Sequence, residues 1–257
     1  MLSSRGASAA LAYHVETLWH FTGQEKTRHQ ERVLPSGKFH LIVDLEAGRG
    51  AVSGLRSRYR VINPAAITSL IGIVFRPGGA HGLFDAPASD FHNQFIALEL
   101  AARSLATQRE PLRDAVTVED KFRVLESAML RVLQRKGERR LTLHPSVQHG
   151  LAEFRLTPNL RRVSQVAKDA GLSRRRFSQL FREQVGMTPK LYCRLRRFRQ
   201  VVRQIAVGTE VDWSDLAFAG GYSDQAHLGH EFRDFSGFTP SEYVASERPF
   251  PNHVRIG

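Results

Sequence analysis

The sequence predicts an α+β protein, in which a β-rich N-terminal domain precedes an all-α domain with two helix-turn-helix motifs joined by a long helix. Three observations lead to this fold class. The first third of the chain holds short β-branched and aromatic runs separated by glycine and proline. Apolar residues then recur at helical spacing from Ser89 onward. A two-part motif that begins at Ser164 returns fifty residues later.

Length and composition fit a globular chain of one large or two small domains. The chain has 257 residues, of which 42% are hydrophobic and 24% are charged. No apolar run approaches the roughly 18 to 20 residues of a bilayer span, and Met1–Trp19 lacks the core of a secretory signal. We therefore expect a cytoplasmic protein. Cys193 is the only cysteine, which excludes an intramolecular disulfide and a zinc site built from several thiolates.

Positive charge is concentrated in one segment. The chain has 37 Lys and Arg against 25 Asp and Glu, a net charge of +12. Arg155–Arg203 alone carries 14 basic and two acidic residues, which accounts for the whole excess, while the rest of the chain has 23 of each sign. Because acidic neighbours are missing, an ordinary solvated helix face explains the segment poorly, and its charge favours a nucleic-acid partner.

The elements of the N-terminal domain follow from its residue types. Phe39–Leu45, Tyr59–Ile62 and Thr68–Phe75 are expected to be strands, whereas Phe91–Leu105 and Val118–Leu133 are expected to be helices. Turns are expected where glycine and proline gather, at Pro35-Ser36-Gly37, Gly48-Arg49-Gly50, Asn63-Pro64 and Pro77-Gly78-Gly79.

An apolar stripe on the second of these helices has two interpretations. We expect it to pack on its own domain, and a dimer seam is the alternative; its members are Phe122, Leu125, Met129, Val132 and Leu133. Gln134–Leu143 is expected to be an exposed connector, and Pro145–Phe154 a lead-in helix. The expected units are a sensor or dimerisation domain with trailing helices at 1–140, the all-α domain at 145–247 and a C-terminal tail at 248–257.

The repeated motif has two blocks in each copy. In the first block an offset of 50 pairs SQVAKDAGLS with SDLAFAGGYS, and so aligns Ala167/Ala217, Gly171/Gly221 and Ser173/Ser223. In the second block the offset is 51 and aligns Phe177/Leu228, Phe181/Phe232, Gly186/Gly237, Thr188/Thr239, Pro189/Pro240 and Tyr192/Tyr243. Two copies are too few for a solenoid, but they are enough for a duplicated motif.

Each copy is expected to form a short helix, a tight turn and a second helix. Gly171 and Gly221 suit the positive φ of a sharp turn, Ser173 caps the next helix in the first copy, and Ser223 or Asp224 does so in the second. In the second helix of copy one, an inward stripe of Phe177, Leu180, Phe181 and Val185 leaves Arg174, Arg175, Ser178, Gln179 and Arg182 outward. Arginine pairs with guanine or phosphate and glutamine with adenine, so this face suits a major groove.

A proline after a capping threonine starts a further helix in each copy, at Thr188-Pro189 and Thr239-Pro240. Thr239 and Glu242 also have the spacing of a capping box. The helix that begins at Lys190 and ends near Ala206 would span about 25 Å. Such a helix can hold two recognition helices roughly one DNA turn apart. It carries Arg194, Arg196, Arg197, Arg199 and Arg203.

Over about Arg161–Ser246 the chain resembles the AraC/XylS family of bacterial transcription regulators. The strings that carry the resemblance are GLSRRRFSQLFREQVGMTPKLYCRLRRF and GGYSDQAHLGHEFRDFSGFTPSEY. In the front region, RVLPSGKFHLIVDL and GIVFRPGGAHGLF are similar to a poorly characterised domain that precedes this module in some family members. The resemblance implies a seven-helix-type DNA-binding domain with two helix-turn-helix units joined by one long helix.

The resemblance also implies which residues read bases: Arg175, Ser178 and Gln179 in copy one and Ala226, Gly229 and His230 in copy two. The arginine that the family often has at the Gln179 and His230 positions is missing from both. The complete set expected to face bases is Arg174, Arg175, Ser178, Gln179, Arg182, Gln225, Ala226, Gly229, His230 and Arg233, and the set expected to contact phosphates is Lys190, Arg194 and Arg197.

The second copy is acidic, because Gly208–Glu247 has only Arg233 against eight carboxylates, a net charge of −7. We expect it to bind DNA weakly, or through helix N-termini and His230. The first copy and the linking helix then supply most of the affinity. Loss of Arg175 or Arg197 is expected to weaken binding far more than loss of His230.

Three further patterns favour structural roles. His227 and His230 lie at i and i+3 without an evident third ligand, so we expect no metal site. Arg76–Gly82 lacks the GK[ST] ending of a phosphate loop and is interpreted as a strand-end turn. Cys193 lacks a partnered base or metal, although a DNA-alkylation-repair methyltransferase carries a similar module, and is interpreted as an ordinary helix residue. No catalytic constellation or cofactor site is evident, so an enzyme is not expected.

The sequence therefore predicts a sequence-specific DNA-binding transcriptional regulator that responds to an effector through its N-terminal domain. Double-stranded DNA is the expected partner, and RNA polymerase, an unknown small-molecule effector and a second copy of the chain are further candidates. The alternatives are a nonspecific nucleic-acid-binding protein and an enzyme that acts on a small molecule and is tethered to DNA by its C-terminal domain.

Overall fold

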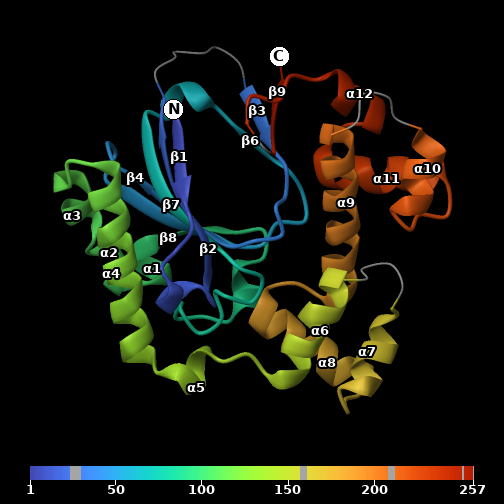
Figure 1. Cartoon of the computed structure of the whole chain (residues 1–257), viewed down its shortest axis with the longest axis horizontal. Coiled ribbons are helices and arrows are strands. Elements are labelled where there is room, and N and C mark those ends of the chain that lie inside the picture. Colours follow the sequence, from blue (N-terminus) through green and yellow to red (C-terminus); the bar gives the residue numbers. More distant parts are fainter. Residues whose placement is uncertain (24–29, 157–160, 208–211, 251, 257) are drawn as a thin grey trace.

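The computed structural model describes residues 1–23, 30–156, 161–207, 212–250 and 252–256. Figure 1 shows a β-rich part packed beside a helical part, with α9 (Pro189–Val207) as the long helix of the second part. This architecture confirms the predicted fold class. The acidic segment that the sequence places at 208–247 includes Glu210, which lies outside the described residues. No helix in the described part of the chain is both long and apolar enough to cross a bilayer.

A six-stranded antiparallel sheet forms the centre of the N-terminal part. Its strands, in the order β1-β2-β7-β4-β5-β8, are Leu2–Arg5, Val15–Thr22, Ser69–Phe75, His40–Asp44, Arg49–Ser53 and Phe95–Ala97. Alternate side chains of β4 are buried, with the period of two that a strand gives, whereas β7 and β5 each have three consecutive buried residues. One-turn helices η1 (Ala9–Leu11), η2 (Pro64–Ala66) and η3 (Ala88–Phe91) connect the strands. The expected strands around His40 and Ser69 are confirmed.

A second sheet has three strands in the order β6-β3-β9, which are Arg60–Ile62, Gln30–Val33 and His253–Ile256. Thus the last residues of the chain return to the N-terminal part and pair with β3. His253 Nδ1 lies 2.7 Å from Glu31 Oε2 across this pairing. The sequence indicates only a tail here, since a four-residue strand whose partner lies more than 200 residues away leaves no local signal.

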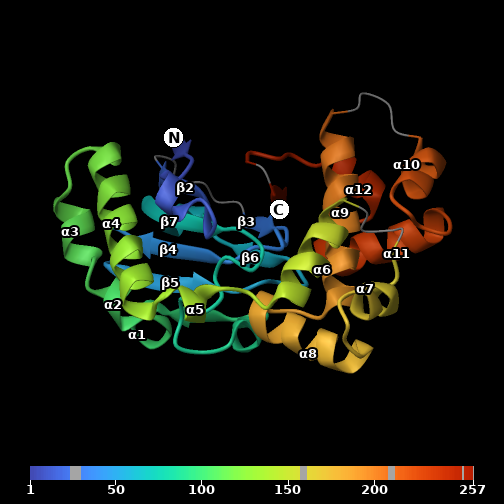
Figure 2. The same cartoon turned by 60° about the horizontal axis from the view of Figure 1, so that its bottom comes forward.

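Helices cover one side of the large sheet (Figure 2). They are α1 (Leu98–Ala101), α2 (Arg103–Ala106), α3 (Arg109–Asp114), α4 (Val118–Lys136) and α5 (Glu138–Leu141). α4 confirms the predicted helix, and Thr117 caps its start by accepting a hydrogen bond from the Asp120 N–H at 3.1 Å. The α4 stripe is buried within its own domain, as the first interpretation expects; its buried members are Phe122, Leu125, Met129 and Val132.

Two expectations for this region are wrong in part. The continuous helix expected at Phe91–Leu105 is interrupted, because Phe95–Ala97 form the edge strand β8 beside β5. Ala102, at φ −162° and ψ 81°, then separates α1 from α2. The connector expected to be exposed has buried leucines at Leu141 and Leu143, which pack into the core. For a short apolar run at an open sheet edge, hydrogen bonding and packing against the neighbouring strand stabilise a strand more than helical propensity stabilises a helix.

The C-terminal part has seven helices within the described residues. They are α6 (Pro145–Leu156), α7 (Val163–Asp169), α8 (Arg174–Val185), α9, α10 (Trp213–Ala219), α11 (Gln225–Ser236) and α12 (Pro240–Ala245). The turn glycines Gly171 and Gly221 have φ of +70° and +73°, which confirms the predicted turns. Thr239 and Glu242 form the predicted capping box. Figure 1 shows α8 at one end of α9 and α11 toward the other.

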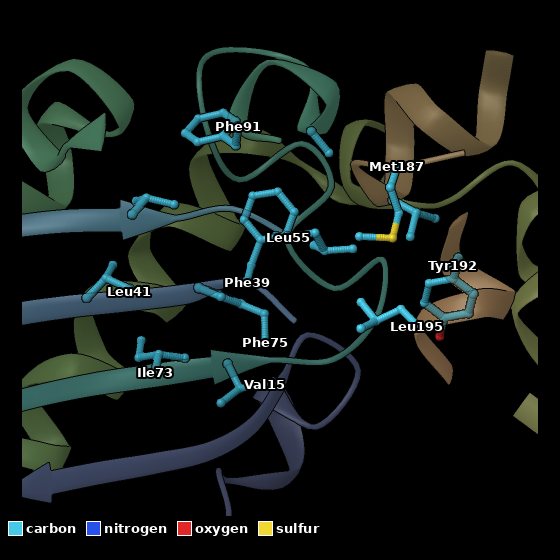
Figure 3. Packing of buried hydrophobic residues seen from close by; sticks show 14 of the residues in the cluster. Val15, Phe39, Leu41, Leu55, Ile73, Phe75, Phe91, Met187, Tyr192 and Leu195 are labelled. Atoms are coloured by element: carbon cyan, nitrogen blue, oxygen red, sulfur yellow. The ribbon is translucent and has the colours of Figure 1, made fainter. Parts of the chain in front are cut away.

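The two parts share one buried core. Figure 3 shows Phe39 and Leu55 of the β-rich part close to Met187 and Leu195 of the helical part, and all four side chains are buried. Gly186, the residue that ends α8, lies against Phe39, so that a Cβ there would come 3.1 Å from the Phe39 ring. A continuous apolar interface of this kind holds the helix-turn-helix units in a fixed position relative to the sheet.

Candidate DNA interface

The helix α8 separates an apolar face from a basic face. Phe154 packs against Phe177 and Phe181, with ring centroids 6.4 and 5.9 Å apart, and this contact buries the inward stripe. On the opposite face Arg174, Arg175, Gln179 and Arg182 are exposed and Ser178 is half-buried. The predicted α8 residues therefore lie together on one accessible surface.

The start of α8 is unusual in its charge. Arg174, Arg175 and Arg176 occupy the first turn, which has no acidic residue. The helix dipole favours negative charge at an N-terminus, so three arginines at this point work against helix stability. None of the three takes part in an ion pair among the described residues, nor does Arg182. A local arrangement that disfavours folding and leaves cations unpaired is typical of a site for an external anion.

The helix α11 presents a different surface. Gln225, Ala226, His230 and Arg233 are exposed and Gly229 is partly exposed, so these predicted residues also share an accessible surface. Gln225 Nε2 donates to Ser214 Oγ at 2.7 Å, and both residues line an open hollow of about 510 Å³ between α10 and α11.

The surroundings of this hollow are acidic. Asp212 caps α10, Asp215 lies in its first turn and Asp224 caps α11. Hydrogen bonds from the His227 N–H and from Ser223 hold the pKa of Asp224 below its ordinary value, so the carboxylate is ionised at neutral pH. The ionised carboxylate disfavours phosphate binding beside this cap.

The linking helix α9 uses its arginines inside the protein. Arg194 Nε donates to Glu231 Oε2 at 2.7 Å and its Nη2 donates to Asp234 Oδ2 at 3.1 Å. Arg197 Nη2 donates to both oxygens of Glu231, at 3.2 and 3.1 Å. The Glu231 side chain is only 3% exposed. These ion pairs fix α11 on α9, and they compete with the phosphate contacts expected of Arg194 and Arg197.

The other α9 arginines also have internal partners. Arg196 donates to the Arg155 carbonyl at 3.1 Å, and Arg199 donates to Asn252 next to β9. Burial lowers the pKa of Arg199 to about 10, which still leaves it protonated at neutral pH. Lys190, at the start of α9, is exposed and has no ion pair among the described residues. Of the three residues expected to contact phosphates, Lys190 alone has a charge that no described carboxylate neutralises.

Glu231 is the functional residue of this region that sequence reasoning missed. The offset of 51 aligns it with Leu180, a buried residue of α8. A carboxylate at an inward position of an amphipathic helix therefore signals a buried ion pair. The charge count treats Glu231 as part of an acidic surface, whereas the structure buries it against two arginines.

The three patterns given structural roles have ordinary surroundings. His227 Nδ1 lies 3.1 Å from Ser223 Oγ, and the described residues contain no group of three or more His, Cys, Asp or Glu side chains that could hold a metal ion. Arg76–Gly82 follows the end of β7 and forms a turn, in which the Gly79 N–H donates to the Arg76 carbonyl at 2.8 Å and the His81 N–H to the Gly78 carbonyl at 3.0 Å. Burial raises the pKa of Cys193 to about 12, so the thiol stays protonated and unreactive at neutral pH.

The fold and the surface together define a two-part protein with a duplicated helix-turn-helix module. Residues 166–246 match the family model described as Helix-turn-helix domain, which is of AraC type. Residues 5–97 match the model described as Domain of unknown function (DUF6597). The chain thus carries an AraC-type helix-turn-helix domain behind an N-terminal domain of unknown function. Helix-turn-helix domains of this type occur in DNA-binding transcription regulators.

Comparison with other proteins adds solved structures of low similarity. No curated protein matches the sequence. ToxT from Vibrio cholerae in its P21 form is 10% identical with a TM-score of 0.43, and the match covers 95% of this chain and 97% of that one. ToxT bound to an unsaturated fatty acid is 12% identical with a TM-score of 0.42, over 95% and 94% of the chains. ToxT bound to (E)-4-(8-methylnaphthalen-1-yl)but-3-enoic acid is 11% identical with a TM-score of 0.44, over 95% and 98%. These likenesses are too low to support a conclusion about this chain.

Proposed function

We propose that the protein is a sequence-specific transcriptional regulator that binds duplex DNA chiefly through α8. The observation that carries the proposal is the row of exposed α8 side chains, which begins with three arginines at the helix N-terminus and lacks ion pairs among the described residues. Anionic DNA would supply the missing countercharge. The helix-turn-helix family of residues 166–246 supports the same partner.

In this proposal α8 enters a major groove with its N-terminal turn foremost. Arg175 pairs with guanine and Gln179 with adenine, while Ser178 can contact either. Arg174 and Arg182 flank them, and Lys190, which lies at the start of α9, contacts the DNA backbone. Because α9 has 19 residues, it spans about 28 Å at 1.5 Å per residue and sets the separation of the two recognition helices.

The second helix-turn-helix contributes less to affinity and acts through α11. Its exposed Gln225, Ala226 and His230 meet base edges, with Gly229 allowing close approach. The carboxylates around its N-terminal cap reduce phosphate attraction there. We therefore propose that α8 determines affinity, whereas α11 determines which neighbouring sequence is tolerated.

We further propose that the N-terminal domain transmits an effector signal to this module in the cytoplasm. The shared core supports the idea, since a rearrangement of the sheet near Phe39 would be felt at the end of α8. The candidate partners in this proposal are an unidentified small-molecule effector, a second copy of the chain and RNA polymerase. The boundaries at 140, 145 and 247 also remain proposals, and the last of them separates β9 from the helical part that it follows.

Selection of bound duplexes from a random-sequence pool tests the proposal. The full chain is expected to enrich one motif, with a strongly specified half that depends on α8 and a weakly specified half about one helical turn away. When the selection is repeated with the Arg175→Ala variant, the half of the motif that depends on α8 should become less strongly specified. If the recovered duplexes show no sequence preference although they bind, the protein is a nonspecific nucleic-acid-binding protein and the proposal is wrong.

A further inference from the structure

The segment Arg56–Arg60 joins β5 to β6 and has a defined position beside η3. Ser57 N–H donates to Asn93 Oδ1 at 2.8 Å, and Asn93 Nδ2 donates back to Ser57 Oγ at 2.9 Å. The Asn93 N–H also donates to the Leu55 carbonyl at 2.9 Å. These contacts fix the start of the segment on the residues that follow η3.

The same segment reaches the C-terminal end of α11. Tyr59 N–H donates to the Phe235 carbonyl at 2.9 Å. The Tyr59 ring also lies against Gly237, where a Cβ would come 2.4 Å from it. Arg32 completes the contact, since its guanidinium lies 4.6 Å from the Tyr59 ring centroid and donates to the Gly237 carbonyl at 2.7 Å. The second recognition helix thus ends on this segment.

At its other end the segment lies near the C-terminal end of α8. His92 directly follows η3, which packs against α8, and a Cβ at Gly186, the C-cap of α8, would come 3.1 Å from the Ala88 carbonyl oxygen of η3. Burial lowers the pKa of His92, and the nearby charges of Arg182 and Arg56 lower it further. The segment 56–60, called the bridge below, thus contacts the end of α11 directly and is connected to the end of α8 through Asn93 and η3.

The charge of this bridge is entirely positive. Arg56, Arg58 and Arg60 have no ion pair among the described residues, and Arg58 and Arg60 are exposed. Arg60 stacks on Phe95, with its guanidinium carbon 4.3 Å from the ring centroid, which positions the side chain without neutralising it. Three like charges in five residues repel one another, so a multivalent anion bound here would stabilise them. The bridge thus carries three cations, none with an ion pair in the described part of the chain, beside the end of α11, where the Tyr59 N–H contacts the Phe235 carbonyl.

We propose that Arg58 and Arg60 of the N-terminal domain contact DNA phosphates between the two recognition helices. The proposal rests on the proposed function, because the duplex is held in place by α8. It goes further in making the N-terminal domain a part of the DNA-binding surface. Phosphate contacts fix the register of a protein on DNA but do not read its sequence. These two arginines should therefore add affinity that is the same for every sequence.

The test compares Arg58→Gln/Arg60→Gln with Arg49→Gln in the full chain. Arg49 is an exposed arginine at the opposite end of β5, so it is a matched control. Affinity is measured against salt concentration with two probes, a duplex recovered by selection and a duplex of random sequence. Loss of two phosphate contacts should reduce the slope of log K against log[salt] by about 1.8. The double variant should weaken binding of both probes by the same factor, of order tenfold or more, and Arg49→Gln should leave both unchanged.

Arg175→Gln separates this proposal from the proposed function, because it should weaken binding of the selected duplex more than that of the random one. One contrary result is that the double variant keeps the wild-type salt slope while Arg175→Gln weakens binding of the selected duplex more than that of the random one. This result overturns the phosphate contacts of Arg58 and Arg60 and leaves the proposed function standing. A wild-type chain that does not distinguish the two probes overturns the proposed function instead.

A tethered iron chelate gives a second, positional readout. Cys193 is buried, so Arg58→Cys provides one accessible thiol for the chelate. Cleavage of the selected duplex should centre between its two half-sites, and the control Arg49→Cys should produce none. Equal cleavage patterns from the two positions contradict the proposal.

Discussion

Arg197 Nη2 on α9 lies 3.1 Å from Glu231 Oε2 on α11, and the carboxylate is buried at the point where the second helix-turn-helix packs on the linking helix. Arg194 approaches the same carboxylate from the preceding turn of α9, at 2.7 Å. One acidic residue therefore forms ion pairs with two of the arginines expected to contact DNA phosphates. The position of α11 relative to α8 depends on this buried cluster.

Glu231→Gln should destabilise the protein strongly. It leaves two arginines without their buried countercharge, and breaking a buried pair from one side costs about 3 to 5 kcal/mol. Urea unfolding followed by circular dichroism measures the change in the free energy of unfolding. Asp234→Asn is the control, because the Asp234 side chain is 67% exposed and surface pairs contribute about 0 to 1 kcal/mol. Equal losses from the two variants would show that the Glu231 cluster does not hold α11.

Arg175→Ala should weaken binding of a selected duplex by about tenfold to a hundredfold, since a bidentate contact to guanine contributes about 1 to 3 kcal/mol. His230→Ala should cost less than fivefold, because α11 lies beside uncompensated carboxylates. Electrophoretic mobility shifts at fixed salt measure both. A loss for His230→Ala as large as that for Arg175→Ala would contradict the asymmetry between the two helix-turn-helix units.

The duplicated motif shows how far the sequence determines the fold. Glycine turns, caps and apolar stripes act within a few residues, and so α8 and the turn at Gly171 are predictable. The strand β9 and the packing of Gly186, the C-cap of α8, on Phe39 depend on contacts between residues far apart in the chain. The sequence pattern also identifies the exposed row on α8, but it cannot show that Arg197 faces a carboxylate 34 residues later.

Gly237→Ala should cost more stability than Gly171→Ala, although both glycines have a left-handed backbone, with φ of +73° and +70°. At Gly171 a Cβ meets nothing within 4 Å, so the cost is backbone strain of about 1 to 2 kcal/mol. At Gly237 a Cβ would lie 2.4 Å from the Tyr59 ring, and the contact with the N-terminal domain must open. Thermal unfolding measures the difference, and proteolysis of the 56–60 segment should increase for Gly237→Ala alone. Equal melting temperatures of the Gly237→Ala and Gly171→Ala variants would contradict a close contact between Gly237 and Tyr59.

Stability should fall between pH 6.5 and pH 4, with His40 as a main contributor. Burial, and then the charge of Lys38, lower the pKa of His40 from 6.5 to about 4. The folded state therefore resists protonation that the unfolded state accepts, and stability that is present above pH 6.5 is lost as the pH falls toward 4. The full effect is about 3 kcal/mol. His40→Gln should flatten the dependence of unfolding free energy on pH, whereas the exposed control His230→Gln should not. A wild-type slope in the His40 variant would contradict this assignment.

The bridge between the recognition helices shows why part of the candidate site was not predicted. Arg60 lies in the strand predicted at Tyr59–Ile62, and the sequence pattern assigns no element to Arg56 and Arg58. The clustering of the three arginines is visible in the sequence, but their position beside the end of α11 follows only from the fold, which brings Tyr59 to Phe235.

The most direct measurement is a competition titration with the full chain at about 0.15 M salt, in which a labelled selected duplex is displaced by the same duplex or by one of scrambled sequence. If the protein reads DNA sequence, displacement needs at least about a thousandfold more scrambled duplex than specific duplex, the lower end of the range for specific DNA-binding proteins. Displacement by both duplexes at similar concentrations would contradict sequence-specific binding.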